Sequence, residues 1–290
     1  MRRNGFTLIE LLVVIAIIAL LLGILVPSLA AIKEYASVAR CLTNHKNIAA
    51  AFLMYAGDND QKFCSGYVFP NANKRNPMSW VIAPIDYDSA GDWIYVGAGD
   101  AGGGQLNLDA RFNGIREGAI YPYLESPKVY HCPGDKRLLK GSSSNVGAST
   151  PPRYYQIYRS YGMPDFYAVH DSVDGVPNKE KSLANIKGTG QKLLFVEDQY
   201  DNAYYNIDAW SYIPYDNAFW DPLGNYHNRS CTFSFVDGHA ELYKWRDPRT
   251  IEFMGNRALA AANGYGKGVR QDGNVDFIWL DANYPAKTRF

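Results

Sequence analysis

The sequence has no excess of charge of either sign, because 29 lysines and arginines balance 29 aspartates and glutamates. A chain without net charge creates no overall field that would attract a polyanion, so we expect no nucleic acid among its partners. Hydrophobic residues fill 47% of the 290 positions, which excludes a disordered chain and suffices for one large core or two small ones.

The sequence also lacks the common catalytic signatures. None of G-x-S-x-G, H-E-x-x-H, S-x-x-K or GK[ST] occurs. Residues 97–102 match G-x-G-x-x-G, but no helical pattern follows them, as a dinucleotide-binding turn requires. We therefore expect neither enzymatic activity nor a cofactor.

Cysteine is scarce, and the absence of any C-x-x-C pair excludes a zinc ribbon and a thioredoxin-like site. We accordingly expect no structural zinc. An even number of cysteines outside the cytoplasm could form two disulfides, with three connectivities that the spacing does not distinguish. The candidates are Cys41, Cys64, Cys132 and Cys231.

A long hydrophobic run lies at the N-terminus. Residues 11–26 are all apolar or glycine, and the hydrophobic segment extends over residues 6–32 with few interruptions. About 20 such residues span a bilayer as a helix. Because Arg2 and Arg3 precede the run, the positive-inside rule leaves them in the cytoplasm and places the rest of the chain on the other side.

Two features distinguish this run from a secretory signal peptide. The carboxylate of Glu10 would cost about 2.5–3.5 kcal/mol at a bilayer centre, somewhat less near an end, and an export signal has no use for it. Apolar residues also continue at helical spacing beyond the small residues 28–30, where a signal peptidase could cut. The pattern predicts one helix over residues 6–56 that ends at Gly57 as a left-handed cap.

Pro27 lies inside this helical pattern. It removes one backbone hydrogen bond and clashes with the preceding turn, so we expect a kink or local unwinding there. The second half of the helix has one apolar face, which should lie on a sheet.

Residues 57–290 are predicted to form an extracytoplasmic head with short strands and many turns. Residues 192–196 look like a buried strand, and residues 277–280 like a late one. Residues 232–236 and 240–245 are expected to pair through a two-residue type I′ turn at Asp237 and Gly238. The fold class is therefore α+β: a long N-terminal helix, transmembrane in its first half, packed by its second half on an antiparallel sheet.

The first residues, Met-Arg-Arg-Asn-Gly followed by Phe-Thr-Leu-Ile-Glu-Leu-Leu, resemble the class III signal of type IV pilins and type II secretion pseudopilins. The resemblance implies that a prepilin peptidase removes residues 1–5 by cutting between Gly5 and Phe6, and methylates the new amino group of Phe6. The hydrophobic helix then stays with the mature chain. Type IV pilins also carry a helix-perturbing proline at about the place of Pro27.

Glu10 has a role under this resemblance. A carboxylate in lipid requires a cationic partner, and cleavage creates one in the α-amino group of Phe6. We expect that partner on a neighbouring subunit, where the ion pair would fix the register of packed helices.

The head resembles a bacterial subfamily of pilin-like proteins. The similar segments include Cys41-Leu-Thr-Asn44 and Cys132-Pro133. In addition, His227 is followed by nine residues and then by Asp237-Gly238, so that residues 227–238 are similar to the subfamily's H-X9-DG region. His45 departs from the subfamily, which more often has an aliphatic residue there.

A metal or acid-base cluster of His227, Asp237 and His239 is one interpretation of this region. We favour another, in which Asp237 serves the turn and His227 orders the hairpin through a hydrogen bond to a backbone group.

Calcium in the head follows from resemblance alone, because major pseudopilins are known to use it. Candidate oxygen clusters are residues 272–276, Asp58 with Asp60, and Asp198 with Asp201, but none completes an EF-hand.

These observations predict a structural subunit of a type IV pilus-like or type II secretion pseudopilus filament. Its partners would be prepilin peptidase, identical or related pilin-like subunits and an inner-membrane assembly platform. It would cross the inner membrane once with an extracytoplasmic head and then enter a periplasmic or surface filament. Two alternatives are a membrane-anchored extracytoplasmic binding protein or hydrolase, and an ordinary exported soluble protein.

Overall fold

The computed structural model describes residues 7–66, 79–82, 85–87, 89, 93–95, 108–136, 138–140, 154–156, 159–167, 172–173, 176–177, 182–199, 210, 212–213, 218–219, 221–255 and 270–285. The α-helices in these ranges are α1 (Leu8–Asp58), α2 (Leu108–Arg116), α3 (Pro248–Gly255) and α5 (Val275–Asn283). Short 3-10 helices include η1 (Tyr121–Tyr123), η2 (Pro127–Tyr130), η3 (Asp165–Tyr167), η4 (Leu183–Asn185) and η5 (Thr189–Gln191). Residues 97–102, which match G-x-G-x-x-G, lie outside the described residues, as do Gly5 and Phe6.

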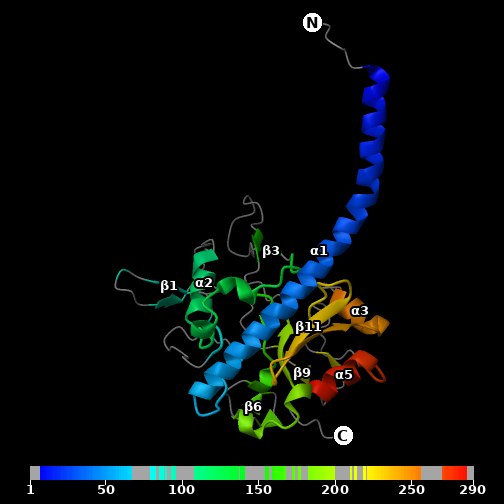
Figure 1. The fold of residues 1–290 in the computed structure, drawn as a ribbon. Helices are drawn as coiled ribbons and strands as arrows, with labels where there is room; N and C mark the ends of the chain where they lie inside the picture. Colours follow the sequence, from blue (N-terminus) through cyan, green and yellow to red (C-terminus); the bar gives the residue numbers. More distant parts are fainter. Residues whose placement is uncertain are drawn as a thin grey trace, which may run out of the picture.

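Helix α1 dominates the N-terminal part of the chain and projects away from the head (Figure 1). Thr7 caps its first turn in a reciprocal arrangement with Glu10. The helix is continuous through Pro27, so the predicted local unwinding does not occur, but its axis bends along its length (Figure 1).

The helix ends two residues later than predicted, and Gly57 is not a left-handed cap. Asn59 caps the helix instead, with its amide Nδ2 donating to the Tyr55 carbonyl at 2.7 Å. The left-handed conformations that reverse the chain belong to Asp60 and Gln61, at φ of 55° and 61°. Asn59 thus caps the C-terminus of the helix through its side chain, the role that the sequence analysis predicted for Gly57.

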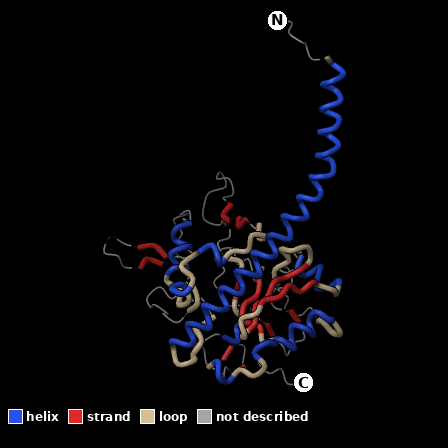
Figure 2. Tube along the Cα trace, viewed as in Figure 1, coloured by secondary structure: helices blue, strands red, loops and turns tan. Residues whose placement is uncertain are grey.

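A four-stranded antiparallel sheet, ordered β12-β11-β8-β5, forms the centre of the head. Its strands are β5 (Tyr161–Gly162), β8 (Leu193–Glu197), β11 (Ser230–Phe235) and β12 (Ala240–Lys244). The second half of α1 lies across it (Figure 2). The α+β class with a long helix on an antiparallel sheet is therefore confirmed.

Two-stranded ribbons surround this sheet. They are β1 (Ile85–Tyr87) with β2 (Trp93–Tyr95), β3 (Leu138–Lys140) with β4 (Tyr154–Gln156), β6 (Ser172–Val173) with β7 (Val176–Pro177), and β9 (Tyr212–Ile213) with β10 (Ala218–Phe219).

Side-chain alternation along β11 separates two apolar clusters. Phe233 and Phe235 belong to the cluster that α3 and α5 cover, whereas Thr232, next to Phe233 on the strand, points to the other face and contacts Cys41 of α1. The cluster on the other face joins residues of α1, such as Phe52, to Phe195 of β8. The sheet is thus covered on both faces.

The predicted strand at residues 192–196 and the predicted hairpin are confirmed, each with small shifts at the ends. The turn differs, because Phe235 N–H bonds to the His239 carbonyl and leaves three residues, 236–238, in the loop. Only Gly238 in this loop has a positive φ, of 90°, whereas a type I′ turn needs two such residues. The prediction of a two-residue type I′ turn was wrong.

The predicted late strand at residues 277–280 was also wrong, because these residues belong to α5. The side chain of Asn274 accepts hydrogen bonds from the N–H groups of Asp276 and Phe277 and so starts a helix. Phe277 and Leu280 are buried at helical spacing. The capping residue, upstream of the apolar run, decided between helix and strand.

Candidate functional site

The first half of α1 is apolar, and the head does not cover it. The large hydrophobic side chains between residues 8 and 32 are 45–77% exposed, and Glu10 is the only charged residue among them. The carboxylate of Glu10 accepts hydrogen bonds from the N–H and hydroxyl groups of Thr7, both at 2.8 Å. By length and composition, this helix could cross a membrane.

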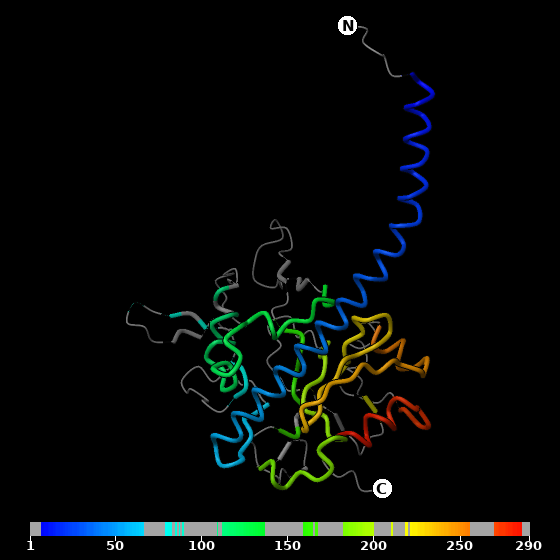
Figure 3. The backbone as a smooth tube through the Cα atoms, viewed as in Figure 1, coloured from blue at the N-terminus to red at the C-terminus, as the bar shows by residue number. Residues whose placement is uncertain are grey.

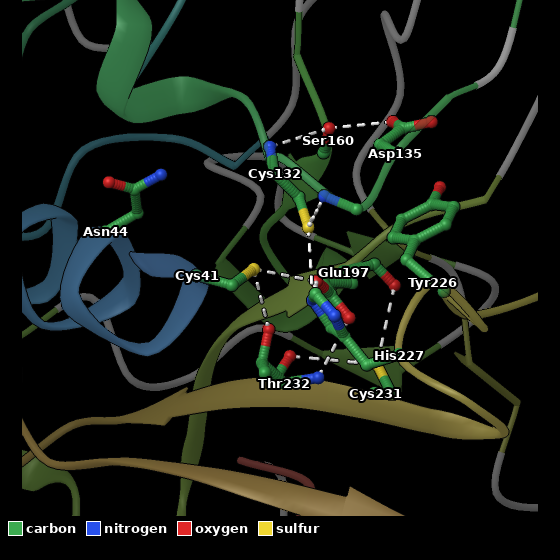
Figure 4. A network of polar contacts seen from close by, with 12 residues as sticks. Cys41, Asn44, Cys132, Asp135, Ser160, Glu197, Tyr226, His227, Cys231 and Thr232 are labelled. Carbon is green, nitrogen blue, oxygen red and sulfur yellow. Dashed lines mark hydrogen bonds and ion pairs between the residues drawn. The ribbon is translucent and has the colours of Figure 1, made fainter. Parts of the chain in front are cut away.

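The second half of α1 brings Cys41 to a group of buried polar side chains in the head. We call Cys41, Cys132, Glu197 and His227 the buried cluster (Figure 4). One sulfur, nitrogen or carboxylate oxygen from each lies within 4.8 Å of the others, and all four residues are buried.

Each member of the buried cluster comes from a different segment. Cys41 is on α1, Glu197 ends the central strand β8, and Cys132 follows η2. Residues 117–136 run beside α1, as Figure 3 shows, and so carry Cys132 to the helix. His227 lies in a tight turn before β11, where Asn228 and Arg229 adopt positive φ.

The four side chains contact one another directly. The Cys41 thiol donates to Glu197 Oε1 at 2.8 Å. His227 Nε2 lies 3.2 Å from the same oxygen and 3.2 Å from Cys132 Sγ. A continuous chain of polar contacts, from Cys41 through Glu197 and His227 to Cys132, therefore joins the helix, the sheet and both loops.

A second set of groups holds these side chains in place. Thr232 N–H donates to Glu197 Oε2 at 2.9 Å, and Gly134 N–H donates to Cys132 Sγ at 3.3 Å. The hydroxyl oxygens of Tyr161 and Thr232 lie 3.0 Å and 3.2 Å from Cys41 Sγ.

His227 has a further neighbour on its other side. Its Nδ1 lies 3.6 Å from Glu34 Oε1, one of the carboxylate oxygens of a residue on α1. Gly134 packs so closely on the imidazole that a Cβ there would meet His227 Cε1 at 2.7 Å. Gly134 thus restricts the ring by close packing, while Glu34 lies near Nδ1 without a hydrogen bond to it.

Burial and charge pairing shift the pKa values of Glu197 and His227 in opposite directions. Burial alone would raise the pKa of Glu197, but the hydrogen bonds and charge of His227, together with the Cys41 thiol, lower it to about 2. Burial alone would lower the pKa of His227, but its interactions with Cys41 and Glu197 raise it to about 10. Without a bound ion, Glu197 and His227 therefore form a buried ion pair.

His45, noted above as unusual, lies next to the buried cluster. Its ring packs edge-on against Tyr161 at a centroid distance of 4.4 Å. Burial lowers its pKa to about 4, so it is neutral near pH 7. It packs as an apolar side chain would.

A surface pocket opens beside the buried cluster, between α1 and the loop after Cys132. Its lining includes Glu34, Gly134 and Tyr226, which contact or adjoin members of the buried cluster. The pocket therefore ends beside the buried cluster, and the imidazole of His227 stays shielded from solvent.

The four cysteines, named above as candidates for disulfides, form none in the structure. All four are free and buried. The fold brings Cys41 and Cys132 into the buried cluster, while Cys64 and Cys231 lie outside it. The structure therefore contains none of the three disulfide connectivities that the sequence left open.

His227 does not order the hairpin through a backbone group, because its Nε2 contacts the side chains of Cys132 and Glu197 instead. Asp237 instead accepts from the His239 N–H and pairs with the exposed His239 ring. The alternative cluster of His227, Asp237 and His239 was also wrong, because only His227 enters the buried cluster.

Sequence reasoning missed Glu197, a single carboxylate at the end of an apolar strand. Of the proposed calcium clusters, residues 272–276 use their oxygens for protein contacts. Asn274 caps α5, and Asp276 accepts from Tyr243 and from the N–H groups of Arg246 and Asp247. Asp201 lies outside the described residues.

Comparison with protein families matches residues 1–26 to the prokaryotic N-terminal methylation motif. The match covers the predicted cleavage position, Glu10 and most of the apolar run. It confirms a pilin-type prepilin signal and indicates that the chain is a substrate of a prepilin peptidase. Comparisons with curated proteins and with solved structures return no match.

Proposed function

We propose that the chain is a non-enzymatic structural subunit of a type IV pilus-like or type II secretion pseudopilus filament. One observation carries this proposal. Behind a prepilin-type signal, the chain has an apolar helix half with a single carboxylate, and the head leaves that half uncovered. Such a surface needs lipid or other apolar helices around it.

The apolar helix half would lie in lipid before assembly and among other helices in the filament. Before assembly, residues 8–32 cross the inner membrane with the head outside the cytoplasm, and the prepilin peptidase acts on the cytoplasmic side. An assembly platform in that membrane then extracts the chain. In the filament, outside lipid, each large apolar side chain that becomes fully buried among neighbouring helices contributes about 1.5–3 kcal/mol relative to exposure to water.

Glu10 sets the register of these packed helices by pairing with the methylated amino group of Phe6 on a neighbouring subunit. Within one chain its carboxylate only caps the first turn. The heads form the outer surface, and their H-X9-DG region is similar to that of the pilin-like subfamily named above.

Glu10→Gln tests this proposal in cells that contain a prepilin peptidase and an assembly platform. Glutamine can also close a capping box, so the variant removes the charge and keeps the helix start. We expect normal cleavage and loss of filaments in sheared fractions viewed by electron microscopy. Ser28→Ala, which removes an exposed polar group from the same half of the helix, should assemble normally.

A membrane-anchored binding protein or hydrolase would give a different result. It uses the helix only as an anchor, so Glu10→Gln would leave its location and behaviour unchanged. Filaments that form equally well with Glu10→Gln and with the unmodified chain would contradict the proposal.

A further inference from the structure

The buried cluster contains the donor types that zinc binds in proteins. Two thiols, one imidazole and one carboxylate converge from α1, the loop after η2, β8 and the turn before β11 (Figure 4). Zinc is held by cysteine sulfur, histidine nitrogen and carboxylate oxygen, usually four of them in a tetrahedron. The fold supplies four such donors at one place.

The four donor atoms lie within 4.8 Å of one another, so the widest pair would approach by about 1 Å around a zinc ion. Bonds of about 2.3 Å to sulfur and about 2.0–2.2 Å to nitrogen and oxygen separate neighbouring donors in a tetrahedron by about 3.3–3.8 Å. The contacts of His227 Nε2 with Cys132 Sγ and Glu197 Oε1 are both 3.2 Å. Cys41 Sγ and Glu197 Oε1 are 2.8 Å apart, so an ion would require them to separate by less than about 1 Å.

The outer contacts are those that a zinc site needs. Ligating histidines usually interact through their other ring nitrogen with a carboxylate or carbonyl, and ligating carboxylates are themselves hydrogen-bonded. Here Glu34 Oε1 lies 3.6 Å from His227 Nδ1, within the range of an ion pair but longer than a hydrogen bond, and Thr232 N–H donates to the second oxygen of Glu197. Gly134 N–H points to Cys132 Sγ, as a donor to a thiolate would.

A hydrogen-bonded network alone explains the site less well. The Glu197 and His227 ion pair accounts for two of the four residues, but a thiol is only a weak donor and a weak acceptor. Hydrogen bonding alone therefore gives no reason for two thiols, rather than hydroxyl groups, in the same polar site. As thiolates they would be strong ligands, and an ion would replace the protons that they lose.

We infer that Cys41, Cys132, Glu197 and His227 bind one zinc ion in a closed structural site that fastens α1 to the sheet and loops of the head. Binding releases the two thiol protons and the extra proton of His227 to solvent. Because all four positions are taken by protein, the ion has no open position for a substrate.

The first experiment measures zinc and thiols in the full chain, purified in detergent with added Zn²⁺ and without reductant. We expect about one zinc per chain by elemental analysis and four titratable thiols after denaturation. Two thiols and no zinc would show a disulfide between Cys41 and Cys132. Four thiols and no zinc would show hydrogen bonds alone, and either result overturns the inference.

Variants assign the ligands. Cys132→Ser and His227→Gln should each lose the bound zinc. Cys64→Ser and His45→Gln are matched controls, because these residues are just as buried but lie outside the cluster, and they should keep it. Zinc lost equally from controls and ligand variants would overturn the assignment.

A measurement on the unmodified chain covers the case in which ligand variants fail to fold. Co²⁺ in place of Zn²⁺ should give intense visible bands of tetrahedral cobalt and a thiolate-to-metal charge-transfer band. The pale spectrum of hydrated Co²⁺ would overturn the inference.

Glu34→Gln tests the outer contact to His227. We expect it to weaken zinc binding about 10–100-fold while the stoichiometry stays unchanged. An unchanged affinity would remove Glu34 from the site. Filament assembly through Glu10 does not depend on any of these outcomes.

Discussion

The thiol of Cys41 donates to the carboxylate of Glu197 at 2.8 Å, so the long N-terminal helix and the central strand meet through two buried polar side chains. Residues 41 and 197 are far apart in the sequence, and the contact forms only when α1 lies on the sheet. The second half of α1 therefore connects the head to the first half of the helix.

The polar contacts of Cys41 should stabilise the head even without metal. In the presence of a chelator, we expect Cys41→Ala to lower the free energy of unfolding by about 1–3 kcal/mol more than Cys64→Ala does, because partners of Cys41 lose a hydrogen bond. Both thiols are fully buried, so the control subtracts the loss of packing. Denaturant unfolding of the full chain in detergent measures the difference, and equal losses would contradict this role.

Asp276 connects α5 to the end of β12. Its carboxylate accepts from the Tyr243 hydroxyl and from the N–H groups of Arg246 and Asp247, at 2.8–3.1 Å. We expect Asp276→Ala to lower the free energy of unfolding by about 2–4 kcal/mol, because these donors lose a charged acceptor.

Asp272 provides the control for that prediction. Its side chain is 63% exposed and pairs with Arg270, so Asp272→Ala should change the free energy of unfolding by less than about 1 kcal/mol. Similar losses for the two variants in denaturant unfolding would show that Asp276 has no special role.

Gly57 offers a test of how α1 ends. Because the helix passes through this position and a Cβ there would meet nothing within 4 Å, Gly57→Ala should raise the free energy of unfolding by about 0.5–1 kcal/mol. A left-handed cap at Gly57 would make the same substitution destabilising. The sign of the change in denaturant unfolding decides between the two.

The sequence predicted the parts of the fold that local patterns determine. Apolar residues at helical spacing located α1, and the alternation of residues 232–236 with the following Asp237-Gly238 located the hairpin. It failed at residues 277–280, because a run of four large apolar residues fits a strand or a helix equally well. The cap at Asn274, which resolves this ambiguity, depends on one side chain.

The buried cluster could not be predicted in the same way. Its four members come from segments separated by 30 or more residues, as the intervals from Cys41 to Cys132, Glu197 and His227 show. No local spacing marks such a site, and scattered cysteines were therefore interpreted as disulfide candidates. Only the packing of α1 on β8, with two loops beside them, brings the ligands together.

The central claim is that the mature chain keeps its apolar helix after the prepilin-type signal has been cut. Mass spectrometry of the N-terminus of the native protein, isolated from membranes, tests this most directly. We predict a chain that begins at Phe6 with a methylated α-amino group. A chain that begins at Ala31, without the apolar helix half, would contradict the account.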